Sequence, residues 1–69
     1  MRDPGRLKGM YERFEVLHEL YCPDWRVGQL ILNFLSWYVN EYHTDTFYVE
    51  DKDFMAKVDR YFEMTFGAK

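Results

Sequence analysis

The sequence predicts an all-α fold: a compact three-helix domain with a short extended segment between the second and third helices, oligomeric through the second. Two patterns predict it. Apolar residues recur every three or four positions through most of the chain, and Pro, Gly and Asp stand where that periodicity breaks. The length is a third observation, because 69 residues make a single domain (1–69) near the lower limit for folding without disulfides or metals.

The first helix is predicted to begin at Asp3 and Pro4. Asp3 is the expected N-cap, and Pro4 suits the first helical position, where its missing N–H costs nothing. Pro23 ends the helix, since the residue before a proline is pushed out of the α region. Its expected core face, at helical spacing, is Leu7, Met10, Phe14, Leu17 and Tyr21.

The second helix is expected to be capped by Asp24 and to run from Trp25 to about Tyr42. Eleven of these eighteen residues are apolar, and at ~100° per residue they cover roughly 240° of the circumference. A surface helix needs an apolar stripe of only about 100°. We therefore expect a homo-oligomer in which a second copy of the chain covers the remainder.

After a polar break at residues 43–45, Thr46–Val49 has the β-branched and aromatic content of a short strand. Asp51 is the expected cap of the third helix, and Asp53 in its first turn suits the positive end of the helix dipole. Gly67 predicts the C-terminal stop. The residues expected to face inward are Phe54, Val58, Tyr61, Phe62 and Thr65.

Composition excludes several function classes. With 9 basic and 12 acidic residues the net charge is −3, which argues against binding to duplex nucleic acid. The single Cys22 excludes an internal disulfide and fits a reducing cytoplasm. No secretory signal is expected, and the longest apolar stretch, residues 30–39, is interrupted by Asn33 and Ser36 and is too short for a membrane span. These features predict a soluble cytoplasmic protein.

Residues that could carry chemistry are sparse. We find no nucleophile elbow, phosphate-binding glycine loop or catalytic triad, so we expect no enzyme, no catalytic residue and no cofactor. His18 and Cys22, four positions apart, could supply two metal ligands, but only His43 is an obvious third. We therefore expect no metal site, and we interpret the acidic residues around Asp51 as helix caps.

One polar stripe on the second helix is the strongest indication of a binding surface. Arg26, Gln29, Asn33, Ser36 and Asn40 are spaced three or four apart, which places all five on one helix face. They offer a guanidinium, three carboxamides and a hydroxyl, groups suited to directional hydrogen bonding. An ordinary solvated face would carry Lys and Glu instead.

Basic residues near the expected helix starts suggest an anion. Arg2 and Arg6 flank the start of the first helix. Arg26 is in the first turn of the second, where a positive side chain opposes the dipole. Either an internal carboxylate such as Asp3 or Glu50 compensates Arg26, or a bound anion does.

Trp25 and Trp37 could stack on a base or ring of a ligand, although tryptophans in short chains are usually core or interface residues. The candidate ligand-binding residues are Arg2, Arg6, Trp25, Arg26, Gln29 and Asn33.

Three segments carry a resemblance to a family of small uncharacterised bacterial and phage proteins: Met1–Leu7, Asp24–Asn33 and Phe47–Asp51. Members typically read Arg-Asp-Pro-x-Arg-Ile, Asp-x-Arg-Leu-Gly-Gln-Leu-Ile-x-Asn and Phe-Tyr-x-Glu-Asp, so Leu7 and Val27 are conservative departures. The resemblance covers most of the chain. It implies no assigned activity, but it implies an accessory role in contending with host defences, in the host cytoplasm if the protein is phage-encoded.

Three functional hypotheses follow. The first is an oligomeric anti-defence sponge that sequesters a small anionic nucleotide-derived ligand through Arg26, Gln29 and Asn33. The second is an inhibitor or adaptor that docks its aromatic face on a host or phage protein, such as a host defence protein. In the third, the stripe satisfies itself across the subunit interface and fixes helix register. The first hypothesis is preferred because amide and guanidinium groups suit a small polar ligand.

Overall fold

The computed structural model describes residues 2–67; Met1 of the opening motif lies outside them. They form three helices of 16 residues each, α1 (Arg6–Tyr21), α2 (Val27–Tyr42) and α3 (Asp51–Phe66). The predicted three-helix, all-α fold is confirmed. Among these residues no helix is long and apolar enough to cross a membrane.

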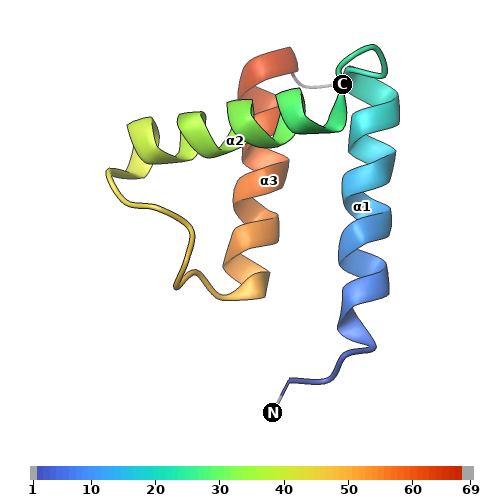
Figure 1. Cartoon of the computed structure of the whole chain (residues 1–69), viewed down its shortest axis with the longest axis vertical. Helices are drawn as coiled ribbons and strands as arrows, with labels where there is room; N and C mark the ends of the chain where they lie inside the picture. Colours follow the sequence, from blue (N-terminus) through green and yellow to red (C-terminus); the bar gives the residue numbers. More distant parts are fainter. Residues whose placement is uncertain (1, 68–69) are drawn as a thin grey trace.

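α1 and α3 lie side by side and run in the same direction, while α2 begins beside the C-terminal end of α1 and crosses in front of α3 (Figure 1). Two ion pairs and a ring contact join α1 to α3 along their length, with sequence offsets of 45 or 46 residues. A constant offset is what two parallel helices require. The three pairs, from the N-terminal to the C-terminal ends, are Arg6 with Asp51, Arg13 with Asp59 and Tyr21 with Phe66.

The core lies where α2 crosses this helix pair. α2 buries one stripe at four-residue spacing, Leu30, Phe34 and Tyr38. The Phe34 ring meets Phe54 and Tyr61 of α3 edge-on, with centroids 5.4 and 5.6 Å apart. The buried stripe is much narrower than the roughly 240° apolar arc of α2, so several apolar side chains of this helix remain exposed.

The helix starts differ from the predicted positions. The Asp3 carboxylate accepts a hydrogen bond from the Gly5 N–H (2.9 Å), as an N-cap would, but the regular helix begins only at Arg6. Asp24 does not cap α2. That helix starts at Val27, and Arg26 occupies the N-cap position with extended backbone angles.

α3 differs in a similar way. Asp51 is its first helical residue rather than its cap, because Glu50 holds the N-cap position. Thr65 was expected to face inward and is exposed, and Phe66 packs against the core in its place. Gly67 ends the helix at φ 83°, as predicted, and its N–H donates to the Glu63 carbonyl oxygen (2.9 Å).

The connection from α2 to α3, residues 43–50, contains no strand. It leaves α2 through His43, whose φ of 60° lies in the left-handed region. The Val49 N–H then donates to the Thr46 carbonyl oxygen (3.2 Å) and closes a turn. The prediction that residues 46–49 are extended, and pair with the same segment of another copy, is not tested by a single chain and stays a prediction.

Candidate functional site

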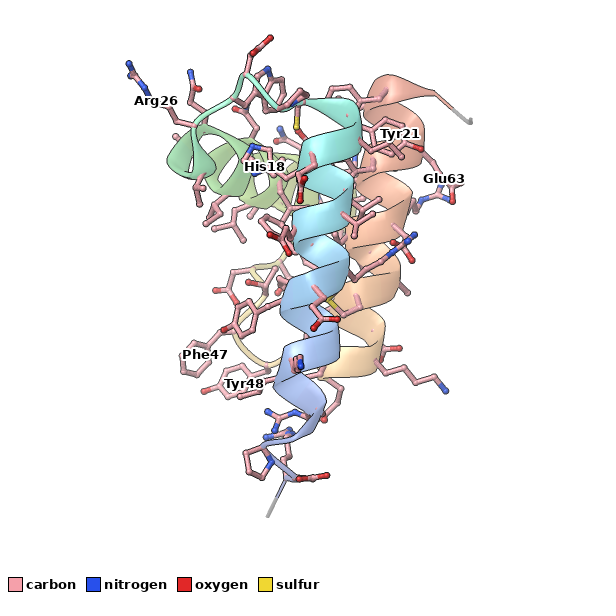
Figure 2. All side chains as sticks on the ribbon, turned by 90° about the vertical axis from the view of Figure 1, so that its right-hand side faces the viewer. His18, Tyr21, Arg26, Phe47, Tyr48 and Glu63 are labelled. Carbon is pink, nitrogen blue, oxygen red and sulfur yellow. The ribbon has the colours of Figure 1, made fainter. Side chains whose placement is uncertain are left out.

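The predicted polar stripe begins at the first turn of α2. The Arg26 backbone N–H donates to Gln29 Oε1 (2.7 Å), which satisfies one donor at the helix start and fixes the Gln29 side chain. The Gln29 amide NH₂ group keeps its capacity to donate to a ligand. The Arg26 side chain points away from the helix bundle (Figure 2), and no carboxylate of residues 2–67 lies within 4.0 Å of its guanidinium.

The rest of the stripe lies on the side of α2 that faces away from α3. Leu32 and Val39, 66% and 47% exposed, each follow a stripe residue by three positions and therefore lie beside it. We call this combined amide and apolar surface the outer face of α2. Its members, all exposed, are Gln29, Leu32, Asn33, Ser36, Val39 and Asn40.

Arg2 and Arg6 do not join the other predicted site residues within one chain. Both Glu50 carboxylate oxygens accept hydrogen bonds from Arg2 Nη2 (3.0 and 2.9 Å), and Arg6 Nε donates to Asp51. The acceptor Glu50 raises the pKa of Arg2, chiefly through this hydrogen bond. These pairs lie at the N-terminal ends of α1 and α3, whereas Arg26 follows the far end of α1. A 16-residue helix is about 24 Å long, so the basic residues form two separate groups.

Trp25 is half-buried, and its ring packs against Phe66 with centroids 5.5 Å apart. Its carbonyl oxygen accepts a hydrogen bond from His18 Nε2 (2.8 Å), which ties the α1–α2 connection back to α1. The ring therefore has a structural partner within the chain, although it neighbours Arg26. Within one chain, the structure brings together Arg26 and Gln29, with Asn33 one turn further along α2, whereas the Trp25 ring packs against α3 instead.

Sequence reasoning missed an open groove of about 400 Å³ between α1 and the start of α2. Its apolar walls include Tyr11 and Val27, which are 71% and 57% exposed. The sequence did contain a signal for this groove. Tyr11 and His18 lie seven positions apart and therefore on one face of α1, next to its core face. The residues lining the groove are Tyr11, Phe14, Glu15, His18, Glu19 and Val27.

A second exposed apolar feature is the aromatic pair in the α2–α3 connection. Phe47 and Tyr48 are 79% and 88% exposed, and their rings contact each other edge-on with centroids 4.7 Å apart. Both project from the side of the molecule on which α2 lies (Figure 2). Asp45 supports this turn by accepting a hydrogen bond from the Phe47 N–H (3.0 Å).

The buried reactive groups belong to the core. Cys22 is 5% exposed, and burial raises the pKa of its thiol. Burial also raises the pKa of Tyr61, while a hydrogen bond with Thr65 acts in the opposite direction. Over residues 2–67, no three His, Cys, Asp or Glu side chains gather closely enough to hold a metal ion.

Among residues 2–67, three surface features therefore stand out: the outer face of α2, the α1–α2 groove and the Phe47–Tyr48 pair. No protein-family model, curated protein or solved structure matches the chain.

Proposed function

We propose that the chain is a non-catalytic docking protein, an inhibitor or adaptor that works as a homo-oligomer and binds a protein partner. The observation that carries the oligomer in this proposal is the outer face of α2, where Leu32 and Val39 are exposed beside the carboxamides of Gln29, Asn33 and Asn40. Apolar groups supply contact area, and amides supply hydrogen bonds that fix orientation. We assign this face to the contact between copies of the chain.

The total surface area supports an oligomer. A compact monomer of 8.5 kDa exposes about 4,650 Å², whereas this chain exposes 5432 Å². The excess of roughly 800 Å² is close to what each partner buries in a standard protein–protein interface. A second copy on α2 would cover an area of this size and complete the burial of the helix.

The Phe47–Tyr48 pair supports a heterologous protein partner. Exposed aromatic side chains anchor many protein–protein interfaces, because they bury a large area at a low cost in conformational entropy. This pair is separate from the outer face of α2, so an oligomer built through α2 would still present it. The resemblance to phage and bacterial proteins is compatible with a partner from a host defence system.

The sponge is the second candidate, and it is favoured by the Arg26 guanidinium, which has no carboxylate of residues 2–67 within 4.0 Å. Arg26, the Gln29 NH₂ group and Asn33 could together hold an anionic nucleotide. This arrangement is open to solvent in one chain, so a second copy would have to close it. The docking role ranks first because exposed apolar surface needs a partner even when no ligand is bound.

Native mass spectrometry tests both candidates in one experiment. The protein would be purified gently from cells with an active nucleotide-signalling defence. We expect an oligomer without added mass, which supports docking. An oligomer carrying extra mass of nucleotide size, lost in Arg26→Ala, would transfer the function to the sponge. A monomer would overturn the oligomer proposal.

Leu32→Asn is the informative variant for the subunit contact. Because Leu32 is 66% exposed in a single chain, its replacement should dissociate the oligomer without unfolding the protomer. Val16→Asn is the matched control, since Val16 is 51% exposed on α1, outside the proposed interface. Equal dissociation of both variants would refute the assignment of the interface to α2.

A further inference from the structure

The groove between α1 and α2 combines an apolar interior with an acidic rim. Phe14 is half-buried within it, and Tyr11 and Val27 form walls that are largely open to solvent. Such a concave apolar surface gains free energy when an apolar side chain enters, by about 25 cal/mol for each Å² removed from water.

The acidic rim consists of Glu15 and Glu19, one helical turn apart on α1. Both carboxylates are exposed, and neither has a basic group of residues 2–67 within 4.0 Å. Two basic residues on the preceding turns of α1 form ion pairs with other carboxylates: Lys8 with Glu12, and Arg13 with Asp59. The rim therefore carries two uncompensated negative charges.

Neighbouring groups do not neutralise this rim. Arg26 directly precedes Val27 in the sequence, yet its guanidinium projects away from His18, which lines the groove (Figure 2). His18 directs Nε2 at the Trp25 carbonyl oxygen, which can only accept, so Nε2 carries the proton that makes this hydrogen bond. The bond links α1 to the α1–α2 connection beside the groove.

We propose that this groove binds a protein segment in which an apolar residue is flanked by Lys or Arg, most simply one face of an amphipathic helix. The apolar side chain would lie on Tyr11, Phe14 and Val27, and the cations would pair with Glu15 and Glu19. This is helix-in-groove recognition, with the charges setting which partner is accepted. The inference deepens the proposed docking function and rests on it.

Charge argues against the other occupants. A second copy of the chain would bring a net charge of −3 to an acidic rim, and we assign the outer face of α2, not the groove, to contact between copies. An anionic ligand would meet like charges at Glu15 and Glu19. A cationic partner is the one class for which apolar and electrostatic terms act together.

A pair of synthetic peptides tests the proposal. The first is an amphipathic helical peptide of Leu and Lys, and its twin has every Lys replaced by Glu while the Leu face is unchanged. Binding would be followed by ¹⁵N NMR titration. We expect the Leu/Lys peptide to bind at least about tenfold more tightly than its twin and to shift the amides of residues 11–19 and Val27.

Matched variants separate the groove from general attraction to an acidic protein. Glu19→Lys should weaken binding of the Leu/Lys peptide by about tenfold or more, whereas Glu63→Lys makes the same charge change on the far side of α3 (Figure 2) and should leave it nearly unchanged. Tyr11→Ser should weaken binding of both peptides. All three residues are exposed, and circular dichroism would verify folding.

Four outcomes would overturn the proposal: equal binding of both peptides, equal weakening by Glu19→Lys and Glu63→Lys, shifts confined to the outer face of α2, or no binding. Dissociation of the oligomer by Tyr11→Ser would assign the groove to a second copy, which also overturns it. Repeating the titration on Leu32→Asn keeps the two proposals distinguishable. If the peptide binds to Leu32→Asn, the proposal for the groove stands even if the native protein proves monomeric. If the peptide fails to bind while the oligomer is intact, only the proposal for the groove is refuted.

Discussion

Cys22 and Tyr61 are titratable side chains that the fold places in its core, 5% and 3% exposed. Burial disfavours the charged thiolate and phenolate, so the pKa of each group is raised, and a charged Cys22 would raise the pKa of Tyr61 further. The thiol therefore stays protonated at neutral pH, and it fills space in the core rather than acting as a nucleophile.

These raised pKa values predict a loss of stability in alkali. Above the ordinary thiol value of 9.0, the unfolded chain releases the Cys22 proton while the folded chain still holds it. The native state then binds more protons than the unfolded state, so the free energy of unfolding falls as pH rises. Cys22→Ala removes this contribution.

Urea unfolding at pH values between 7 and 10.5 would measure the effect. We expect the wild type to lose more stability than Cys22→Ala over the upper part of this range. Tyr61→Phe should likewise reduce the loss of stability at high pH, although it also removes the hydrogen bond with Thr65. Parallel curves for the wild type and Cys22→Ala would show that burial does not perturb the thiol.

At the scale of one element, the C-terminal end of α2 holds a non-glycine residue in an unfavourable conformation. His43 adopts φ 60° and ψ 29°, and its N–H donates to the Val39 carbonyl oxygen (2.8 Å). The left-handed region costs an L-residue about 1 kcal/mol or more relative to glycine. The helix can end here because this conformation turns the chain toward α3.

His43→Gly should therefore stabilise the protein, by about 0.5 kcal/mol after the larger chain entropy of glycine in the unfolded state is subtracted. In a domain of this size that corresponds to a rise in Tm of about 2–4 °C. Calorimetry would measure this shift. Thr44→Gly, at a position without positive φ, should instead lower Tm, and a rise there would contradict the argument.

Much of each element could be predicted from the sequence. The periodicity of Leu17, Val58 and Phe62 located the core faces, and Gly67 marked the last helix end. The starts of α2 and α3 could not be placed to the residue. Asp24 and Asp51 both have the chemistry of a cap, and only the folded backbone selects the residue that takes extended angles.

At the scale of the whole molecule, the arrangement of the helices could not be predicted from the sequence pattern. The parallel course of α1 and α3 and the crossing of α2 over α3 depend on contacts between residues far apart in the sequence, such as Arg13 with Asp59 and Phe34 with Tyr61. The α1–α2 groove arises from that arrangement, whereas the separation of Arg2 and Arg6 from Arg26 follows from the length of α1 between them. The polar stripe on α2 was predictable because it belongs to a single helix.

The same arrangement links stability to assembly. A chain of 69 residues buries a smaller fraction of its surface than a larger domain does, so it is marginal alone, and α2 leaves Leu32 and Val39 exposed. If a second copy covers them, unfolding is coupled to dissociation, and Tm must depend on protein concentration. For a dimer of this size unfolding with about 100 kcal/mol of enthalpy, each tenfold dilution should lower Tm by about 5 °C.

Calorimetry and fluorescence melting over a hundredfold range of concentration would measure this dependence. Leu32→Asn should melt at the wild-type protein's low-concentration limit, and its Tm should be the same at every concentration. Val16→Asn should keep the full dependence. A wild-type Tm that is independent of concentration would mean that α2 is stable with its outer face in water, and the subunit contact would then have to be replaced by contact with a different protein.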